Sequence, residues 1–362
     1  MKVYGEPTRS IRSIDDGMAV EILDQTSLPF RFEKVVLTDW RDCVEAIREM
    51  RVRGATLTGI AGAWAMVLAT LENPSNEALK TAAEVIAAAR PTSASLASAV
   101  HRMYSTLVPR ESAKRFAAAV KLAEEMTQED VLTNRAIGDA GKSLIADLYA
   151  QVRRPVNILT VGNGGWLSTV DYGTALSPVY MAFEQGTPLH VWTTETRPCN
   201  QGLLSAWEMR QVGVPHALVA DGAVGQLMQQ GDVDLVIVGA SHMTRRGDFA
   251  SEIGTYLTAL AANDNDVPFY VAAPSSVIDW CMTDGKREIE IESRSASEVL
   301  GVKGLDRSGN PLTVELAPIE EAAANPAFDV THNRFVTGII TERGVISPVD
   351  LATVFADKQP KN

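Results

Sequence analysis

The sequence has few cysteines and no long apolar run at its start. Its three cysteines, Cys43, Cys199 and Cys281, are far apart and form no CxxC or CxxH spacing, so a zinc site is not expected. An odd number of scattered cysteines is typical of free thiols in a reducing compartment. The polar N-terminus lacks the apolar core of a signal peptide. We therefore expect a cytoplasmic protein without a bound metal.

Basic residues are not clustered either, although the chain is strongly charged. The formal net charge of the 362 residues is −12, and no stretch gathers Lys and Arg as a nucleic-acid-binding protein requires. The most apolar segment, residues 55–71, contains Thr56, Thr58 and two glycines. It is shorter than the roughly 20 residues that span a bilayer. We expect it to be a buried helix, and we expect neither nucleic acid nor a membrane as a partner.

The first 150 residues predict a small β element followed by helices. Short β-like runs at 19–23, 30–32 and 35–37 are separated by turn residues, and Asp39 is a plausible N-cap for the next helix. Apolar residues then recur at helical spacing. The further helices are expected at 59–71, 76–89, 94–107, 111–126 and 128–151.

The pattern changes near residue 155, where short apolar runs alternate with helical segments. Such runs are typical of parallel strands covered on both faces, and repeated βα units predict a doubly wound parallel sheet. The expected strands are 156–161, 189–193, 216–219, 235–238 and 269–272, and the expected helices are 173–185, 203–211, 222–230 and 252–263. The predicted fold class is α/β, with a β plus helical domain at 1–150 and a Rossmann-like domain at 151–362.

Ligands of open α/β sheets bind beyond the carboxyl ends of the strands. The loops at those positions are rich in glycine and hydroxyl side chains, and backbone N–H groups in such loops favour an anion. Arg53 and Gly54, which open the apolar helix, form a workable phosphate clamp. A small anionic molecule, most simply a phosphate ester, therefore fits. Each motif taken alone is equally consistent with a tight turn, a surface charge or a helix cap. The loops in question are 162–165, 194–198, 221–222, 239–242 and 273–276.

Several segments together resemble the methylthioribose-1-phosphate isomerase family, and the resemblance extends from residue 23 to residue 342. That family shares its fold with ribose-1,5-bisphosphate isomerases and with regulatory subunits of a translation-initiation exchange factor. The matching segments include Val52-Arg53-Gly54-Ala55, Arg90-Pro91-Thr92-Ser93, Glu195-Thr196-Arg197-Pro198, Gln201-Gly202 and Ile253-Gly254-Thr255-Tyr256.

The resemblance implies an aldose-to-ketose isomerisation of a sugar that carries phosphate on its anomeric carbon. It implies no metal or organic cofactor, and a homodimer formed through the parallel-sheet half. By resemblance, Arg53, Gly54 and Arg90 hold the phosphate and Gln201 binds the sugar hydroxyls. Ala55, Asn163 and Asp221 belong to the same loops, and we add them as candidate substrate-binding residues.

The sequence departs from the family pattern at its catalytic positions. The family reads Thr-His-Cys-Asn-Thr-Gly where this chain has Gly162 in place of the catalytic cysteine, and Gly-Ala-Asp-Arg where it has Ser241 in place of the catalytic aspartate. An Asn-Lys pair becomes Ser251-Glu252, and a proline becomes Thr56. Isomerisation needs groups that move protons, each of which typically contributes about 10²–10⁴-fold.

Three hypotheses follow from this departure. The first is a divergent isomerase of a phosphorylated sugar, with His242, Asp248 and Glu252 as candidate proton carriers. The second is hydrolase or lyase chemistry on a small anion, with Glu252 and His242 as a base–acid pair. The third is a ligand-binding or regulatory protein without turnover.

Overall fold

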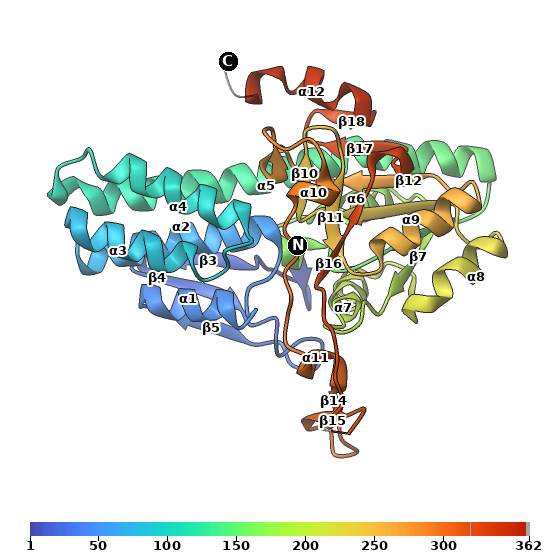
Figure 1. Cartoon of the computed structure of the whole chain (residues 1–362), viewed down its shortest axis with the longest axis horizontal. Coiled ribbons are helices and arrows are strands. Elements are labelled where there is room, and N and C mark those ends of the chain that lie inside the picture. The colour runs from blue at the N-terminus through green and yellow to red at the C-terminus, as the bar shows by residue number, and fades with distance from the viewer. Residues whose placement is uncertain (319, 360–362) are drawn as a thin grey trace.

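The computed structural model describes residues 1–318 and 320–359, and it has two parts that lie side by side (Figure 1). An arm of long helices extends to one side. A twisted sheet with helices on both faces forms the other side, and a thin hairpin projects from the molecule below it. The α/β fold class predicted from the sequence is confirmed.

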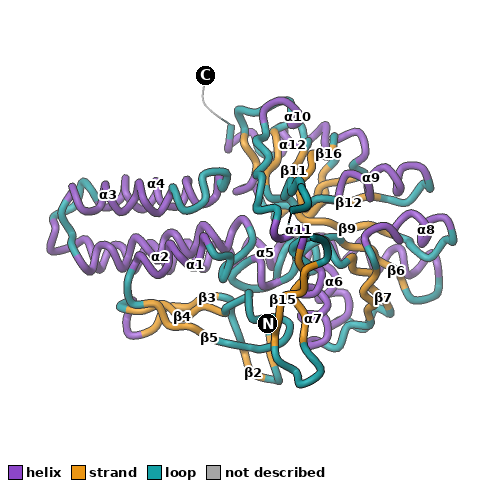
Figure 2. Tube along the Cα trace, turned by 60° about the horizontal axis from the view of Figure 1, so that its bottom comes forward, coloured by secondary structure: helices purple, strands orange, loops and turns teal. Residues whose placement is uncertain are grey.

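The N-terminal part is a three-stranded antiparallel sheet beneath a helical layer (Figure 2). Asp39 caps the first helix as expected, because its side chain accepts a hydrogen bond from the Arg41 backbone N–H. The expected strand at 30–32 is wrong, since the N–H groups of Phe30 and Arg31 turn back to the Ser27 carbonyl oxygen. The elements are β1 (Lys2–Val3), β2 (Glu6–Pro7), β3 (Ile11–Ile14), β4 (Ala19–Leu23), β5 (Lys34–Leu37), α1 (Trp40–Arg48), α2 (Ala55–Glu72), α3 (Asn76–Ala87) and α4 (Ala94–Leu107).

One helix, α5 (Ser112–Val152), replaces the two that were expected at 111–126 and 128–151. No break occurs at Thr127, because its hydroxyl donates back to the Ala123 carbonyl oxygen and accepts a hydrogen bond from the Trp64 indole. The helix packs on α2 in the N-terminal part and on α6 (Ser177–Glu184) in the C-terminal part. Both predicted domains therefore share α5.

The C-terminal part is built on a seven-stranded sheet in the order β18-β17-β12-β9-β6-β7-β8, and only the β17–β18 pair is antiparallel. All five strands expected from the sequence belong to it. The chain leaves the centre of the sheet in opposite directions from β6 and β9, so the topological switch point lies between these two strands. The strands are β6 (Val156–Thr160), β7 (Leu189–Thr194), β8 (His216–Val219), β9 (Leu235–Gly239), β12 (Phe269–Ala272), β17 (Gly338–Thr341) and β18 (Gly344–Ile346).

Burial on both faces explains why these strands are almost continuously apolar. In β6, Ile158 packs into the core beneath α5, α6 and α7, and its neighbour Leu159 packs into the core on the other face. Alternate side chains of a strand point to opposite faces, so both must be apolar. The covering helices are α7 (Gly202–Val212), α8 (Val224–Gln229) and α9 (Thr255–Asp264).

A second, four-stranded sheet with the order β13-β10-β11-β16 was not expected. The helix expected at 252–263 is therefore wrong at its start. Glu252 ends strand β11 and pairs with Phe328, and α9 begins at Thr255, after Gly254 with φ +99. The remaining elements are β10 (His242–Thr244), β11 (Phe249–Glu252), β13 (Ile278–Asp279), α10 (Gly285–Glu288), α11 (Ser297–Leu300), β14 (Gly301–Leu305), β15 (Pro311–Glu315), β16 (Phe328–Thr331) and α12 (Leu351–Val354).

Among the described residues, one helix is long and apolar enough to cross a membrane. This helix is α2, and 83% of its most apolar window is buried inside the protein. Its buried side chains belong to the N-terminal core, which explains the apolar composition.

Candidate functional site

A cavity of about 670 Å³ lies where the two parts of the molecule meet. Its walls come from the start of α2, the loops after β6 and β9, the end of β11 and the extended segment 289–292. The switch point of the sheet therefore opens into it, as expected for an α/β fold. Most of the predicted site residues line this one cavity, although they are distant in sequence: Arg53, Gly54, Ala55, Arg90, Asn163, Gln201, His242 and Glu252. Ser241, which replaces the family's catalytic aspartate, also lines it.

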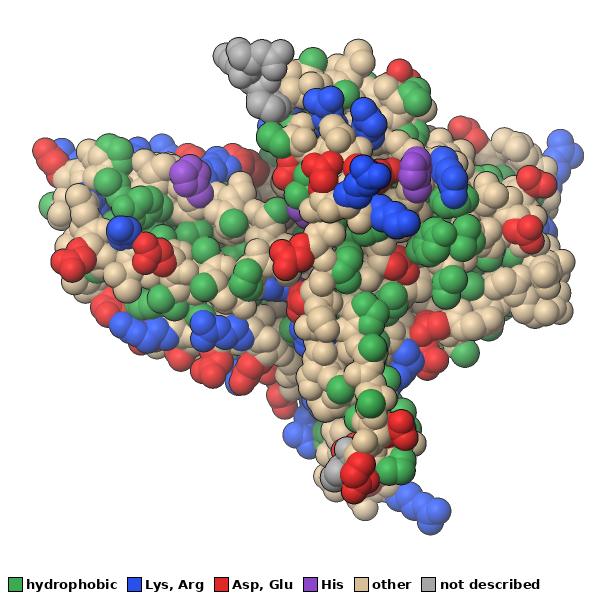
Figure 3. All heavy atoms as spheres, viewed as in Figure 1, with side chains coloured by type: hydrophobic (Ala, Val, Ile, Leu, Met, Phe, Trp, Pro, Cys, Tyr) green, Lys and Arg blue, Asp and Glu red, His purple; other side chains and the backbone are tan. Residues whose placement is uncertain are grey.

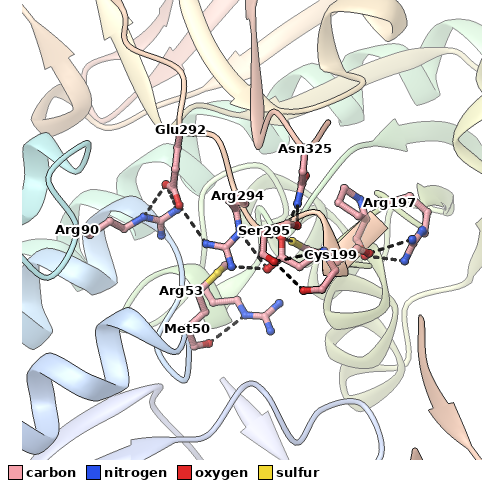
Figure 4. Close-up of polar contacts among 12 residues, drawn as sticks. Met50, Arg53, Arg90, Arg197, Cys199, Glu292, Arg294, Ser295 and Asn325 are labelled. Atoms are coloured by element: carbon pink, nitrogen blue, oxygen red, sulfur yellow. Dashed lines mark hydrogen bonds and ion pairs between the residues drawn. The ribbon is translucent and has the colours of Figure 1, made fainter. Parts of the chain in front are cut away.

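Arg53 provides a positive charge that has no acidic partner among the described residues. Its Nε donates to the Met50 carbonyl oxygen at 3.1 Å, and no carboxylate forms an ion pair with it. Figure 4 shows the guanidinium lying apart from the paired arginines, Arg90 and Arg294. Burial lowers the pKa of Arg53, which indicates that its charge is incompletely solvated. An anion in the cavity would supply the missing partner.

Helix α2 adds a second feature that favours an anion. Gly54 is its N-cap residue, with φ +94 and no side chain to cap the first turn. A side chain at this position would overlap the backbone of Ser168, so the close approach requires glycine. The uncapped N-terminus of an 18-residue helix beside Arg53 combines free N–H groups with a favourable dipole.

Arg90 also lines the cavity, but it is already paired. Its Nη2 lies 3.0 Å from Glu292 Oε2, and the Thr92 hydroxyl donates to the same oxygen at 3.3 Å. The other Glu292 oxygen accepts a hydrogen bond from Arg294. Sequence analysis missed Glu292, and the alternation of Glu and Ile at 288–292 was the available signal for an extended, half-buried segment.

Glu252 places a carboxyl group at the centre of the cavity wall. Its Oε2 accepts a hydrogen bond from the Ser251 hydroxyl at 2.9 Å, and burial is the main cause that raises the pKa of this carboxyl. Gly162 lies directly beside it with φ +79. A Cβ atom added there would lie 2.8 Å from both Cδ and Oε2 of Glu252. The Glu252 carboxyl thus occupies the space that any side chain at position 162 would need.

Two further polar side chains end in the cavity without partners. The Nδ2 atom of Asn163, whose side chain is 4% exposed, and the Nε2 atom of His242 have no hydrogen bond within the described residues. His242 Nε2 is 4.0 Å from Asp279 Oδ2, and burial lowers the pKa of the imidazole. Both residues line the cavity, so these two groups have hydrogen-bonding capacity that a ligand could use.

Two predicted residues do not line the cavity. The Asp221 carboxylate accepts hydrogen bonds from the backbone N–H groups of Thr196 and Arg197, at 2.7 and 2.8 Å. Asp248 is buried, and its carboxylate accepts hydrogen bonds from Gly285 and Asn333 at 3.1 and 2.9 Å. Both carboxylates hold loops together, so the direct roles predicted for them in substrate binding and proton transfer do not fit their positions.

Metal chemistry was not expected from the sequence. Within residues 1–318 and 320–359, no group of three or more His, Cys, Asp or Glu side chains is arranged to hold a metal ion.

Comparison with known proteins places this geometry in a family. The model of the initiation factor 2 subunit family matches residues 51–348. A methylthioribose-1-phosphate isomerase of Acidiphilium cryptum is 50% identical over 362 residues, covering 99% of this chain and 98% of the relative. The chain belongs to the methylthioribose-1-phosphate isomerase family.

Two solved structures have the same fold as this chain, and one is named as an isomerase and the other as an initiation-factor subunit. The 5-methylthioribose 1-phosphate isomerase of Pyrococcus horikoshii matches with a TM-score of 0.83 and 34% identity, covering 97% of each chain. The translation initiation factor eIF-2B subunit delta of A. fulgidus matches with a TM-score of 0.80 and 34% identity, covering 97% of this chain and all of the other. The fold and the 34% identity of these two solved structures therefore do not separate an isomerase from an initiation-factor subunit. The curated relatives that are about 50% identical over the full length are isomerases.

The positions that depart from the family pattern lie together in the structure. Gly162 touches Glu252, and Ser241 lines the same cavity. The residues expected to hold phosphate, Arg53 and Gly54, follow the family pattern and lie on the opposite part of the wall, at the start of α2. The departures at Gly162, Ser241 and Glu252 thus lie at or beside this cavity, whereas the departure at Thr56 lies at the start of α2.

Proposed function

We propose that the protein is an aldose–ketose isomerase of a small sugar that carries phosphate on its anomeric carbon. Family membership supports this reaction class. The observation that carries the proposal is that one cavity contains both groups that such a reaction needs. Arg53, which has no acidic partner, lies at an uncapped helix N-terminus, and the Glu252 carboxyl lines the same cavity. The first two features bind a phosphate, and the carboxyl can move protons.

The reaction transfers one hydrogen from carbon 2 to carbon 1 of the sugar. It requires a proton on the ring oxygen as the ring opens, a base that removes the proton from carbon 2, and return of a proton to carbon 1. The hydroxyl group on carbon 2 then loses its proton and becomes the ketone. The atoms therefore balance without an oxidant. One carboxyl group can serve as base at carbon 2 and acid at carbon 1 if both carbons lie beside it.

We assign these two proton transfers to Glu252. Its raised pKa suits a group that must both accept and donate a proton. His242, with a free Nε2 in the cavity, is assigned to the ring oxygen, where a neutral imidazole can donate its N–H. Gly162 permits this arrangement because it leaves the space that the carboxyl occupies.

The test is proton NMR of the purified protein with aldose 1-phosphates, including methylthioribose 1-phosphate, in D₂O. We expect a ketose product that carries solvent deuterium at carbon 1, because a carboxyl acid exchanges its proton with solvent. Release of inorganic phosphate without a ketose would favour the hydrolase or lyase hypothesis. Thermal stabilisation by the ligand without any product would favour the regulatory hypothesis.

The assembly and domain division are also proposed rather than observed. We propose a homodimer formed through the parallel-sheet part, and a division near residue 150 between the two domains. Light scattering of the full chain at micromolar concentration tests the first, since a monomer mass would exclude the dimer. Limited proteolysis tests the domain division. We expect α5 itself to resist cleavage, because both parts of the molecule pack on it.

A further inference from the structure

A second cavity adjoins the first one and shares part of its wall. Gly54, Ala55, Asn163, Ser241 and Glu252 line both cavities. We call the second cavity the hydroxyl chamber, because hydroxyl side chains form much of its wall: Thr56, Ser168, Thr169, Thr174 and Ser241. The remaining wall consists of glycine, alanine, proline and valine, together with Asn163 and Glu252.

The two cavities differ in charge. Arg53 and Arg90 line the first cavity and are absent from the hydroxyl chamber, whose only charged wall residue is Glu252. A phosphate is therefore held in the first cavity, and the chamber offers no cation for a second one. An uncharged end of the ligand therefore fits the chamber better than a second phosphate does.

Several polar groups of the chamber have unused hydrogen-bonding capacity. The Ser241 hydroxyl has no partner among the described residues, and Asn163 Nδ2 is buried without one. The Thr174 hydroxyl reaches only the Gly164 carbonyl oxygen, at 3.5 Å, which is beyond the usual hydrogen-bond length. Ser168 and Thr169 already donate to the backbone at 2.7 and 2.8 Å. The Ser168 hydroxyl oxygen is left as an acceptor, whereas the Thr169 hydroxyl oxygen already accepts a hydrogen bond from the Gly173 N–H at 3.1 Å. Donors and acceptors are thus both present.

We infer that the hydroxyl chamber binds the hydroxyl-bearing end of the sugar that lies remote from the phosphate. The inference rests on the proposed function, in which Glu252 acts at carbons 1 and 2. Since Glu252 lines both cavities, the phosphate on carbon 1 is assigned to the first cavity and the carbons remote from the phosphate to the second. The preferred substrate is then an aldose 1-phosphate with a free terminal hydroxyl. A terminal deoxy or thioether group would leave the chamber's polar atoms without partners, which is costly.

The experiment compares three substrates that share the phosphate and carbons 1 and 2: ribose 1-phosphate, 5-deoxyribose 1-phosphate and methylthioribose 1-phosphate. We expect kcat/KM for ribose 1-phosphate to exceed that for the deoxy sugar by at least about tenfold, the value of one good hydrogen bond. Thr174→Val should bring the ratio of kcat/KM for ribose 1-phosphate to that for the deoxy sugar close to one. Thr174→Ser, which keeps the hydroxyl, should restore the preference.

Thr187→Val is the matched control, because Thr187 precedes β7 at the opposite end of the sheet and lines neither cavity. It should change none of the three values. Equal or higher kcat/KM for the deoxy or thioether sugar would overturn the inference while leaving the isomerase proposal intact.

Binding calorimetry separates the two proposals. Tighter binding of ribose 1-phosphate than of the deoxy sugar, lost in Thr174→Val and without turnover of any sugar, would support the chamber assignment and overturn the isomerase. Absence of both binding and turnover for all three sugars would overturn both.

Discussion

The two walls of the cavity differ in how closely their residues match the family pattern. The arginine wall, formed by Arg53, Gly54 and Arg90, matches the family motifs. The strand-end wall, formed by Ser241 and Glu252 with Gly162 directly beside Glu252, departs from them. Arg53 is left without an acidic partner, whereas the carboxyl of Glu252 fills the space beside Gly162. The residues expected to bind phosphate thus follow the family pattern, whereas the two positions that are catalytic in the family, and Glu252 near them, do not.

The largest expected effect comes from the strand-end wall. Glu252→Gln should lower kcat by about 10²–10⁴-fold, the usual contribution of a general acid–base group, and should leave the ligand's Kd nearly unchanged. Glu290→Gln, at an exposed residue that also lines the cavity, is the matched control and should have little effect. Unchanged turnover in Glu252→Gln would remove this residue from the mechanism.

The same assignment predicts a pH profile. Burial raises the pKa of Glu252 above its ordinary value of 4.5, and the base must be ionised to accept a proton. The value of kcat/KM should therefore rise with pH through a pKa above 4.5 and should fall as the carboxyl is protonated in acid. A profile that is flat through this range would contradict the assignment.

The next effect belongs to the arginine wall. Arg53→Ala should weaken anion binding by about 10- to 100-fold, because a hydrogen bond to a charged group contributes about 1.5–3 kcal/mol. Arg245→Ala is the control, since Arg245 is exposed and lies outside the cavity. Figure 3 shows that Lys, Arg and His side chains gather on the surface over β10 and α10, where loss of one charge should matter little. Equal losses of affinity in titration calorimetry would count against the site.

Substitution of Gly162 tests whether its close approach to the Glu252 carboxyl matters for activity. Gly162→Ala introduces a Cβ 2.8 Å from the Glu252 carboxyl, so we expect a loss of roughly tenfold or more in kcat as that group is displaced. Gly186→Ala is the matched control, because Gly186 also has positive φ, at +83, but has no atom within 4 Å of the added Cβ. Both variants should lose stability from backbone strain of about 1–2 kcal/mol. Loss of activity in both alike would show that strain alone is responsible.

The smallest effect on catalysis is expected outside both walls. Asp248→Ala leaves the N–H groups of Gly285 and Asn333 without their acceptor, so the free energy of unfolding should fall by about 1–3 kcal/mol in urea titrations. The activity of the folded protein should change little. A large loss of kcat at unchanged stability would return Asp248 to the list of proton carriers.

Local patterns predicted much of the fold correctly. The strand at 216–219 and the helix at 94–107 have the predicted bounds. Both patterns, a continuous apolar run and a helical period, are formed by residues that are close in sequence. The expected break near residue 127 failed, since Thr127 is accommodated by a hydrogen bond from Trp64, far away in the sequence. The four-stranded sheet was missed for a similar reason, because short strands are stabilised by partners that no local window contains.

The sequence by itself determined the fold class, the family resemblance and the identity of the residues that replace the family's catalytic pair. Only the tertiary structure decided that Glu252 lies against Gly162, that Arg90 is held by Glu292 and that Asp221 and Asp248 support loops. The direction of each side chain depends on strand register, and β11 takes its register from β10 and β16. Such pairing joins distant segments, and a shift of one residue would turn Glu252 to the other face of the sheet.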